Sequence, residues 1–158
     1  MTEMGVAIPA SLTYAPINFE TETLADGLGR AGVDLNAPAI FAWLGVVPYL
    51  TCEATMATLG SIAAMPAGSQ VIFDYGEPRE NLPEPARVIA EELARRVAAA
   101  GEPWISFFQP PDLAADVKAL GYSRIDDFGQ AALNTRYFAG RTDGLAVSAT
   151  AHVMRATV

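Results

Sequence analysis

Two periodicities of hydrophobic and polar positions alternate along the chain. Short apolar runs at 39–46 and 71–74 have the length and composition of buried strands. Stretches beginning at 51, 86 and 110 instead repeat apolar residues every three or four positions, as amphipathic helices do. Strands that alternate with helices predict an α/β domain with a mostly parallel sheet.

The stretch AIFAWLGVVPYLT, Ala39–Thr51, is the most informative of these patterns. Its continuous apolar part, Ala39–Val46, predicts a strand buried on both faces, as in parallel sheets covered by helices. Thr51 is expected to cap the helix that follows. Because ligands of such sheets bind beyond the carboxyl ends of the strands, Tyr49 is expected near a site.

The remaining elements are predicted from shorter patterns. Tyr14–Phe19 resembles a short strand, and Pro16 places it at an edge or a bulge. Glu22–Ala31 predicts a helix that ends at Gly32. Further along, the pattern predicts a helix at Ala86–Ala100, a helix opened by Pro110, a strand within Tyr122–Phe128, a short helix at Gln130–Phe138 and a last strand at His152–Val158.

Composition narrows the class of protein. The chain has 158 residues, of which 51% are hydrophobic and 18% charged, so we expect one domain, 1–158, with a true core. A net charge of −8 argues against a nucleic-acid surface. No apolar run reaches the roughly 20 residues of a membrane span. The N-terminus lacks the basic region of a secretory signal, so a cytoplasmic location is expected.

Several candidate motifs have simpler structural interpretations. The glycines of Gly27–Gly32 match G-x-G-x-x-G, but they fall at the end of a predicted helix, whereas a phosphate-binding turn precedes one. Cys52 and His152 are each the only residue of their type, so neither a disulfide within the chain nor a His/Cys metal cluster is expected. His152 is predicted to be a structural or surface residue, and Cys52 a small packing residue.

Some side chains near predicted strand ends leave two alternatives open. Asp74 and the pair Asp126 and Asp127 can serve a site or lie in solvated turns. An aromatic cluster in GEPWISFFQPP is expected to act in the core or as a lid; it comprises Trp104, Phe107 and Phe108.

Together the motifs resemble a known family. The similar segments are, in order, YAPINFETETLADGL, FAWLGVVPYLT, VIFDYG, GEPWISFFQPPDLAADVKALGY and LNTRYFAGR. They resemble the leucine carboxyl methyltransferase-like family of class I S-adenosylmethionine-dependent methyltransferases, from about Val6 to the C-terminus. The resemblance implies S-adenosylmethionine as cofactor and a small-molecule or carboxylate methyl acceptor that the sequence does not identify.

The same resemblance implies a partial fold. The family's cofactor-binding glycine turn and its ribose-binding acidic residue precede the segment that matches YAPINFET, so we expect the C-terminal part of a Rossmann-like sheet without strands 1 and 2. The remaining strands should follow the order 4-5-7-6, with the last strand antiparallel. Tyr14–Phe19 would then be displaced or irregular. Ala39–Val46 would become an open apolar edge that could pair with another copy of the chain.

Only part of the family's cofactor site carries over to this chain. Asn18 and Phe19 stand where the family has an Asp-Leu-type pair near the adenine. Leu44 and Gly45 correspond to the last two residues of a Trp-Glu-Gly segment, with Leu in place of Glu. Tyr49 matches a family tyrosine. The sequence identifies no catalytic residue, and methyl transfer needs mainly positioning of an already activated group.

The sequence therefore leaves three functions open. The first is a methyltransferase that binds S-adenosylmethionine weakly or not at all as this chain alone. The second is a non-catalytic interaction module that pairs through the open edge at Ala39–Val46. The third, nucleotide binding at Gly27–Gly32, has little support from the position of its glycines.

Overall fold

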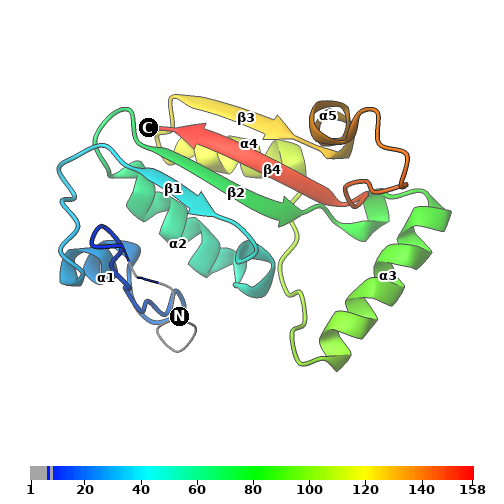
Figure 1. The fold of residues 1–158 in the computed structure, drawn as a ribbon, viewed down its shortest axis with the longest axis horizontal. Helices are drawn as coiled ribbons and strands as arrows, with labels where there is room; N and C mark the ends of the chain where they lie inside the picture. Colours follow the sequence, from blue (N-terminus) through cyan, green and yellow to red (C-terminus); the bar gives the residue numbers. More distant parts are fainter. Residues whose placement is uncertain (1–6, 8) are drawn as a thin grey trace.

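The computed structural model describes residue 7 and residues 9–158. In this part of the chain, four strands form one sheet in the order β1-β2-β4-β3, as Figure 1 shows. The strands are β1 (Ile40–Trp43), β2 (Gln70–Gly76), β3 (Arg124–Phe128) and β4 (Ala151–Thr157). β1 pairs in parallel with β2, whereas β4 runs antiparallel to both of its neighbours.

This topology confirms the predicted fold class. With β1 and β2 as the family's strands 4 and 5, and with β3 and β4 as strands 6 and 7, the observed order is the expected 4-5-7-6. Three strands point the same way and the last one is reversed. The sheet therefore has the strand order and directions expected for the C-terminal part of a Rossmann-like sheet.

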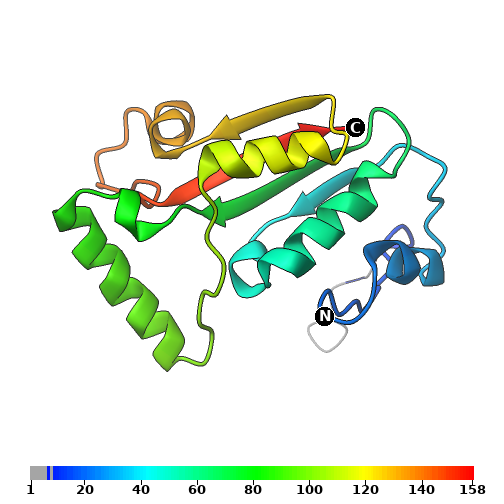
Figure 2. The same ribbon diagram turned by 180° about the vertical axis from the view of Figure 1, so that it is seen from behind.

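Two helices, α2 (Cys52–Ala63) and α4 (Pro110–Ala119), cover one face of this sheet and lie in front of it in Figure 2. The core between them and the sheet includes the fully buried Leu59, Ile62, Phe73, Leu113 and Met154. Thr51 caps α2 as predicted, because its hydroxyl accepts a hydrogen bond from the amide of Ala54. The short 3₁₀ helix η2 (Val47–Tyr49) links β1 to α2.

The expectation that Ala39–Val46 is buried on both faces is wrong. The strand is shorter, Ile40–Trp43, and only its Trp43 is fully buried. Ile40 is 72% exposed and Leu44 55% exposed, because β1 is an edge strand and its outer face lies opposite the helical layer. An apolar run therefore indicated a strand correctly but did not indicate how many of its faces are covered.

Tyr14–Phe19 forms no strand, which corrects the prediction from its residue pattern and agrees with the displacement expected from the resemblance. The segment instead packs on α1 (Leu24–Arg30). A Cβ atom at Gly27 would lie 2.4 Å from Cγ1 of Ile17, so glycine is needed where the segment crosses the helix. The backbone carbonyl of Pro16 also accepts a hydrogen bond from Arg30.

Helix α3 (Glu84–Ala99) follows the short 3₁₀ helix η3 (Arg79–Asn81) and extends away from the sheet, as both ribbon views show. None of its residues is buried. Its apolar side chains Val88 and Ile89 are 57% and 71% exposed. The helix predicted at Ala86–Ala100 therefore exists, but its apolar stripe does not contribute to the core.

The C-terminal part of the chain adds a short helix, α5 (Gln130–Leu133), continued by a π-helical turn, η4 (Asn134–Phe138). A hollow lies on the outer face of the sheet, and its lining residues include Leu44, Ile72, Phe128, Leu133 and Tyr137. α5 and η4 thus border part of that face. None of the described helices is both long and apolar enough to cross a membrane.

Candidate functional site

The carboxyl ends of β1 and β2 meet a segment that is distant in sequence, residues 104–108. The amide of Ile105 donates to the carbonyl of Pro48 at 2.8 Å, and the buried hydroxyl of Ser106 donates to the carbonyl of Val47 at 2.8 Å. Further on, the amide of Phe108 donates to the carbonyl of Gly76 at 3.0 Å. These bonds tie the aromatic segment to η2 on one side and to the end of β2 on the other.

A cavity of about 180 Å³ lies between these elements, and we call it the β2-end pocket. Ten residues line it: Pro48, Asp74, Tyr75, Gly76, Trp104, Ser106, Phe107, Ser148, Thr150 and Ala151. The crevice outside the carboxyl ends of strands is where sheets of this kind bind ligands. The pocket is therefore the candidate ligand site with the best position in the fold.

Asp74 connects the β2-end pocket to the end of β1. Its Oδ1 accepts a hydrogen bond of 2.6 Å from the amide of Gly45. Gly45 has a φ of +70°, a left-handed backbone conformation that glycine adopts readily. The turn after β1, which includes a predicted cofactor contact, is thus held against a carboxylate of the pocket.

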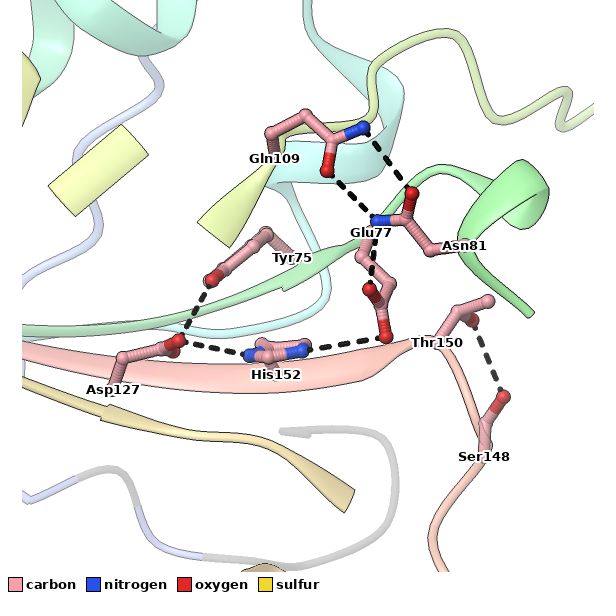
Figure 3. A network of polar contacts seen from close by, with 8 residues as sticks. All are labelled: Tyr75, Glu77, Asn81, Gln109, Asp127, Ser148, Thr150 and His152. Atoms are coloured by element: carbon pink, nitrogen blue, oxygen red, sulfur yellow. Dashed lines mark hydrogen bonds and ion pairs between the residues drawn. The ribbon is translucent and has the colours of Figure 1, made fainter. Parts of the chain in front are cut away.

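Beside the pocket, four side chains from β2, β3, β4 and the residue after β2 form a polar network, shown in Figure 3. The hydroxyl of Tyr75 donates to Oδ2 of Asp127 at 3.1 Å, and Nδ1 of His152 lies 3.0 Å from the same oxygen. On its other side, Nε2 of His152 lies 3.6 Å from Oε1 of Glu77. The imidazole is therefore held between two carboxylates.

The strand register explains why these groups meet. Tyr75 and His152 are directly paired across β2 and β4, and their rings stack at 5.0 Å with an interplanar angle of 31°. A Cβ atom at Gly129 would lie 2.9 Å from Cε1 of His152, so the chain after β3 also passes close to the imidazole. Side chains from three strands thus fix the position of one ring.

The network changes the proton affinity of its members. The hydrogen bond to Asp127 is the main cause that raises the pKa of His152 above its usual 6.5, with a further contribution from Glu77 and an opposing effect of burial. Burial and the nearby Asp127 carboxylate raise the pKa of the Tyr75 phenol. Tyr75 therefore stays neutral, and His152 keeps its proton to a higher pH than a free imidazole does.

A second set of polar contacts extends the network toward the surface, and Figure 3 shows both. The side-chain amide of Asn81 donates to Glu77 at 2.9 Å and to Gln109 at 2.8 Å. The hydroxyls of Ser148 and Thr150 lie 3.4 Å apart at the start of β4. Polar groups from η3, the start of α4 and the loop before β4 thus surround the same end of the sheet.

The candidate cofactor residues at the start of the chain lie away from this pocket. Oδ1 of Asn18 accepts a hydrogen bond from the amide of Glu20 at 3.0 Å, so it forms a local turn. The ring of Phe19 packs 5.7 Å from that of Trp43. Phe19 also borders a second, open hollow of about 340 Å³ next to the start of α2, together with Glu20, Glu22 and Thr51.

The other three candidates occupy different surroundings. Leu44 faces the hollow on the outer face of the sheet, and Gly45 donates to Asp74. Tyr49, in η2, is 38% exposed. The structure therefore brings Gly45 next to the β2-end pocket but does not gather all five residues around one cavity.

Several other residues can be placed directly. Gly32 has a φ of +81° and ends α1, as the interpretation of Gly27–Gly32 as a helix exit predicted. Cys52 is exposed at the start of α2. Asp126 is bound by Arg124 and Arg155, whereas its neighbour Asp127 belongs to the network.

The sequence did not predict the contacts of His152, which was expected to be a structural or surface residue. It also did not single out Glu77, Asn81 or Gln109. The available signal was the strand pattern: an antiparallel strand at 151–157 places its histidine on the same face as a residue of β2. That pairing needs the register, which the sequence does not specify.

Comparison with known protein sequences finds a family match for part of the chain. Residues 1–63 match the sequence profile of the leucine carboxyl methyltransferase family, which confirms the resemblance for this part of the chain. Among curated protein sequences, none matches significantly.

Similar solved structures include one described as a possible exported protein from Bordetella parapertussis, with a TM-score of 0.52 and 10% identity over 78% of this chain and 40% of that one. A DUF574 family protein from Streptomyces avermitilis has a TM-score of 0.48 and 16% identity over 79% of this chain and 46% of that one. A SAM-dependent methyltransferase from Archaeoglobus fulgidus has a TM-score of 0.46 and 10% identity over 79% of this chain and 61% of that one. The chain thus spans less than half the length of the first two structures.

Proposed function

We propose that this chain, whose residues 1–63 match the leucine carboxyl methyltransferase family, is part of an S-adenosylmethionine-dependent methyltransferase. The observation that carries the proposal is the strand order β1-β2-β4-β3 with β4 reversed, which is the second half of the family's sheet. The ends of β1 and β2 would then supply the side of the active site where the methyl group is transferred.

The residues present fit one side of the cofactor. When bound, S-adenosylmethionine supplies a methyl group that is already activated, so the protein has mainly to position it and exclude water. Phe19 offers an aromatic wall for the adenine, and the glutamate and threonine oxygens beside it offer acceptors for hydroxyl or amino groups. All four carboxylate oxygens of Glu20 and Glu22 already have a partner: those of Glu20 accept from the amide and hydroxyl of Thr51, and those of Glu22 accept from the amide of Asn18 and pair with Arg30.

The methionine part of the cofactor has no comparable partner among the described residues. In the family a glycine turn at a helix N-terminus holds it, and the glycines of Gly27–Gly32 lie within and after α1 instead. We therefore expect the chain alone to bind S-adenosylmethionine weakly or not at all.

This expectation is tested by isothermal titration calorimetry of the purified chain with S-adenosylmethionine. The expected dissociation constant is about 1 mM or weaker, because only the adenosine side of the cofactor is contacted. The same titration of a Phe19→Ala variant is the control. Heat that persists in this variant does not come from binding beside Phe19. A micromolar dissociation constant for the unmodified chain would contradict the expectation.

A second function, an interaction module that pairs through its open edge, is favoured by β1. Among the described residues 7 and 9–158, this strand has a neighbouring strand on one side only, β2, and its Ile40 is 72% exposed. Unpaired backbone groups beside exposed apolar side chains are a template for pairing with another strand. We propose a second copy of this chain as the partner.

The edge-pairing proposal predicts a concentration-dependent dimer in light scattering coupled to size-exclusion chromatography. Ile40→Lys should shift the population to the monomer, because the added charge would be desolvated in the paired edge. Ile89→Lys is the matched control, since Ile89 is 71% exposed but lies on α3, away from β1. A monomer at all concentrations, or equal effects of both substitutions, would exclude pairing at β1.

A further inference from the structure

We propose that the β2-end pocket is the methyl-acceptor site and that it selects an amine over a carboxylate. This inference rests on the proposed methyltransferase function and adds the chemical class of the acceptor. It follows from the walls of the pocket, from its charge and from its position beside the turn that contains Gly45.

Three aromatic residues are among the ten that line the pocket. Trp104 and Phe107 come from the segment that crosses the strand ends, and Tyr75 comes from β2. The ring of Phe107 is fixed at Gly76, where a Cβ atom would lie 3.3 Å from its Cδ1. Aromatic faces attract cations and are poor surroundings for anions, because the ring face carries the negative part of the quadrupole.

The charge of the pocket also favours a cationic ligand. Asp74 is the charged residue among the ten that line it, and none of the ten is Lys, Arg or His. Oδ1 of Asp74 is engaged by Gly45, which leaves Oδ2 to accept from a ligand. A carboxylate ligand a few ångströms from this side chain would be repelled, whereas an ammonium group would be attracted.

The charged groups around the pocket do not reverse this preference for a cation over an anion. Glu77 and Asp127 flank the single imidazole of His152, so this cluster is negative even when His152 is protonated. The guanidinium of Arg79 stacks on Phe107 at 4.8 Å from the ring centre, but Arg79 is not among the lining residues. This guanidinium therefore lies against an aromatic ring and is not among the groups that a carboxylate would meet inside the pocket.

Position links this pocket to methyl transfer. Asp74 binds the turn that follows β1, and the family resemblance places Gly45 at the cofactor. A ligand held by Asp74 would thus lie beside the edge of the sheet at which the methyl group is expected.

The test measures ligand binding without cofactor, so it remains informative if the methyltransferase proposal fails. Two probes of similar shape and opposite charge are titrated into the full chain: phenethylamine and 3-phenylpropionate. Binding is followed by tryptophan fluorescence, since Trp104 lines the pocket, and by chemical-shift changes in NMR spectra. Comparison with Trp104→Phe identifies the part of the fluorescence change that comes from the pocket.

We expect phenethylamine to bind at least tenfold more tightly than 3-phenylpropionate. Asp74→Asn should reduce that preference about tenfold, while its side-chain oxygen can still accept from Gly45. Asp116→Asn, an exposed position on α4, makes the same change in net charge and should leave the preference unchanged. If Asp74→Asn does not fold, Trp104→Leu followed by NMR should weaken phenethylamine binding several-fold.

Equal or tighter binding of the carboxylate, no saturable binding of either probe, or equal effects of Asp74→Asn and Asp116→Asn would overturn the inference. Because the probes are titrated without cofactor, these outcomes do not depend on whether the chain binds S-adenosylmethionine, and a failure of the proposed function is recognised separately.

Discussion

Phe73→Ala is expected to lower the free energy of unfolding by about 3–5 kcal/mol, the largest effect of any substitution proposed for this chain. Phe73 is fully buried in β2, which has a partner strand on each side. Its ring lies 6.1 Å from that of Trp43 and 6.2 Å from that of Tyr75, so truncation would leave a cavity between two aromatic side chains.

Urea denaturation followed by circular dichroism measures this loss. Tyr137→Ala is the control, because Tyr137 is 64% exposed and its removal should change stability by about 0.5 kcal/mol or less. A loss below about 1.5 kcal/mol for Phe73→Ala would mean that the site collapses around the smaller side chain or that β2 is not the centre of the core.

Asp127→Asn is expected to have the second largest effect and to change how stability depends on pH. Asp127 accepts hydrogen bonds from both Tyr75 and His152, and its replacement leaves partly buried groups less well paired. A loss of about 1–3 kcal/mol follows from one or two such groups. The pH dependence gives the more specific signature.

The sign of that dependence follows from the raised pKa of His152 in the folded protein. Folding stabilises the protonated imidazole, so its contribution is fully present below the unfolded value of 6.5. It is lost as the pH rises through the higher pKa of the folded state. The unmodified chain should therefore become less stable from slightly acidic to slightly alkaline pH, and Asp127→Asn should flatten this trend.

Urea midpoints across this pH range measure the effect, with the exposed Asp116→Asn as the control for loss of one carboxylate. A trend that is equally steep in Asp127→Asn and in the unmodified chain would assign the pH dependence to other groups. Glu77, on the other side of His152, also raises the pKa of the imidazole, so we expect a smaller slope to remain in Asp127→Asn.

The strand order could be predicted from the sequence because successive segments resemble one family, and a family fixes its topology. Predictions from single residues were also confirmed where one residue determines the local geometry. Thr51 caps α2, and Gly32 ends α1 with a positive φ. In each case the information lies within a few neighbouring residues. Such signals do not depend on how distant parts of the chain pack.

The candidate site depends on contacts between distant parts of the chain, so it could not be predicted from the sequence. Tyr75, Asp127 and His152 lie on three strands, and only the register of β2, β3 and β4 brings them together. Likewise, the apolar run at Ile40 does not say whether a helix covers its second face. The aromatic residues Trp104 and Phe107 were expected in the core or in a lid, and they line a pocket because residues 104–108 bind the ends of β1 and β2.

The exposed position of α3 has a consequence for how the domain loses structure. Since none of its residues is buried, unwinding this helix exposes little apolar surface that the native state hides. What holds the helix is its own backbone hydrogen bonds and local ion pairs such as those of Glu92 with Arg95 and Arg96. We therefore expect its amide hydrogens to exchange with solvent by local opening while the sheet stays intact, so that α3 opens as a cooperative unit of its own.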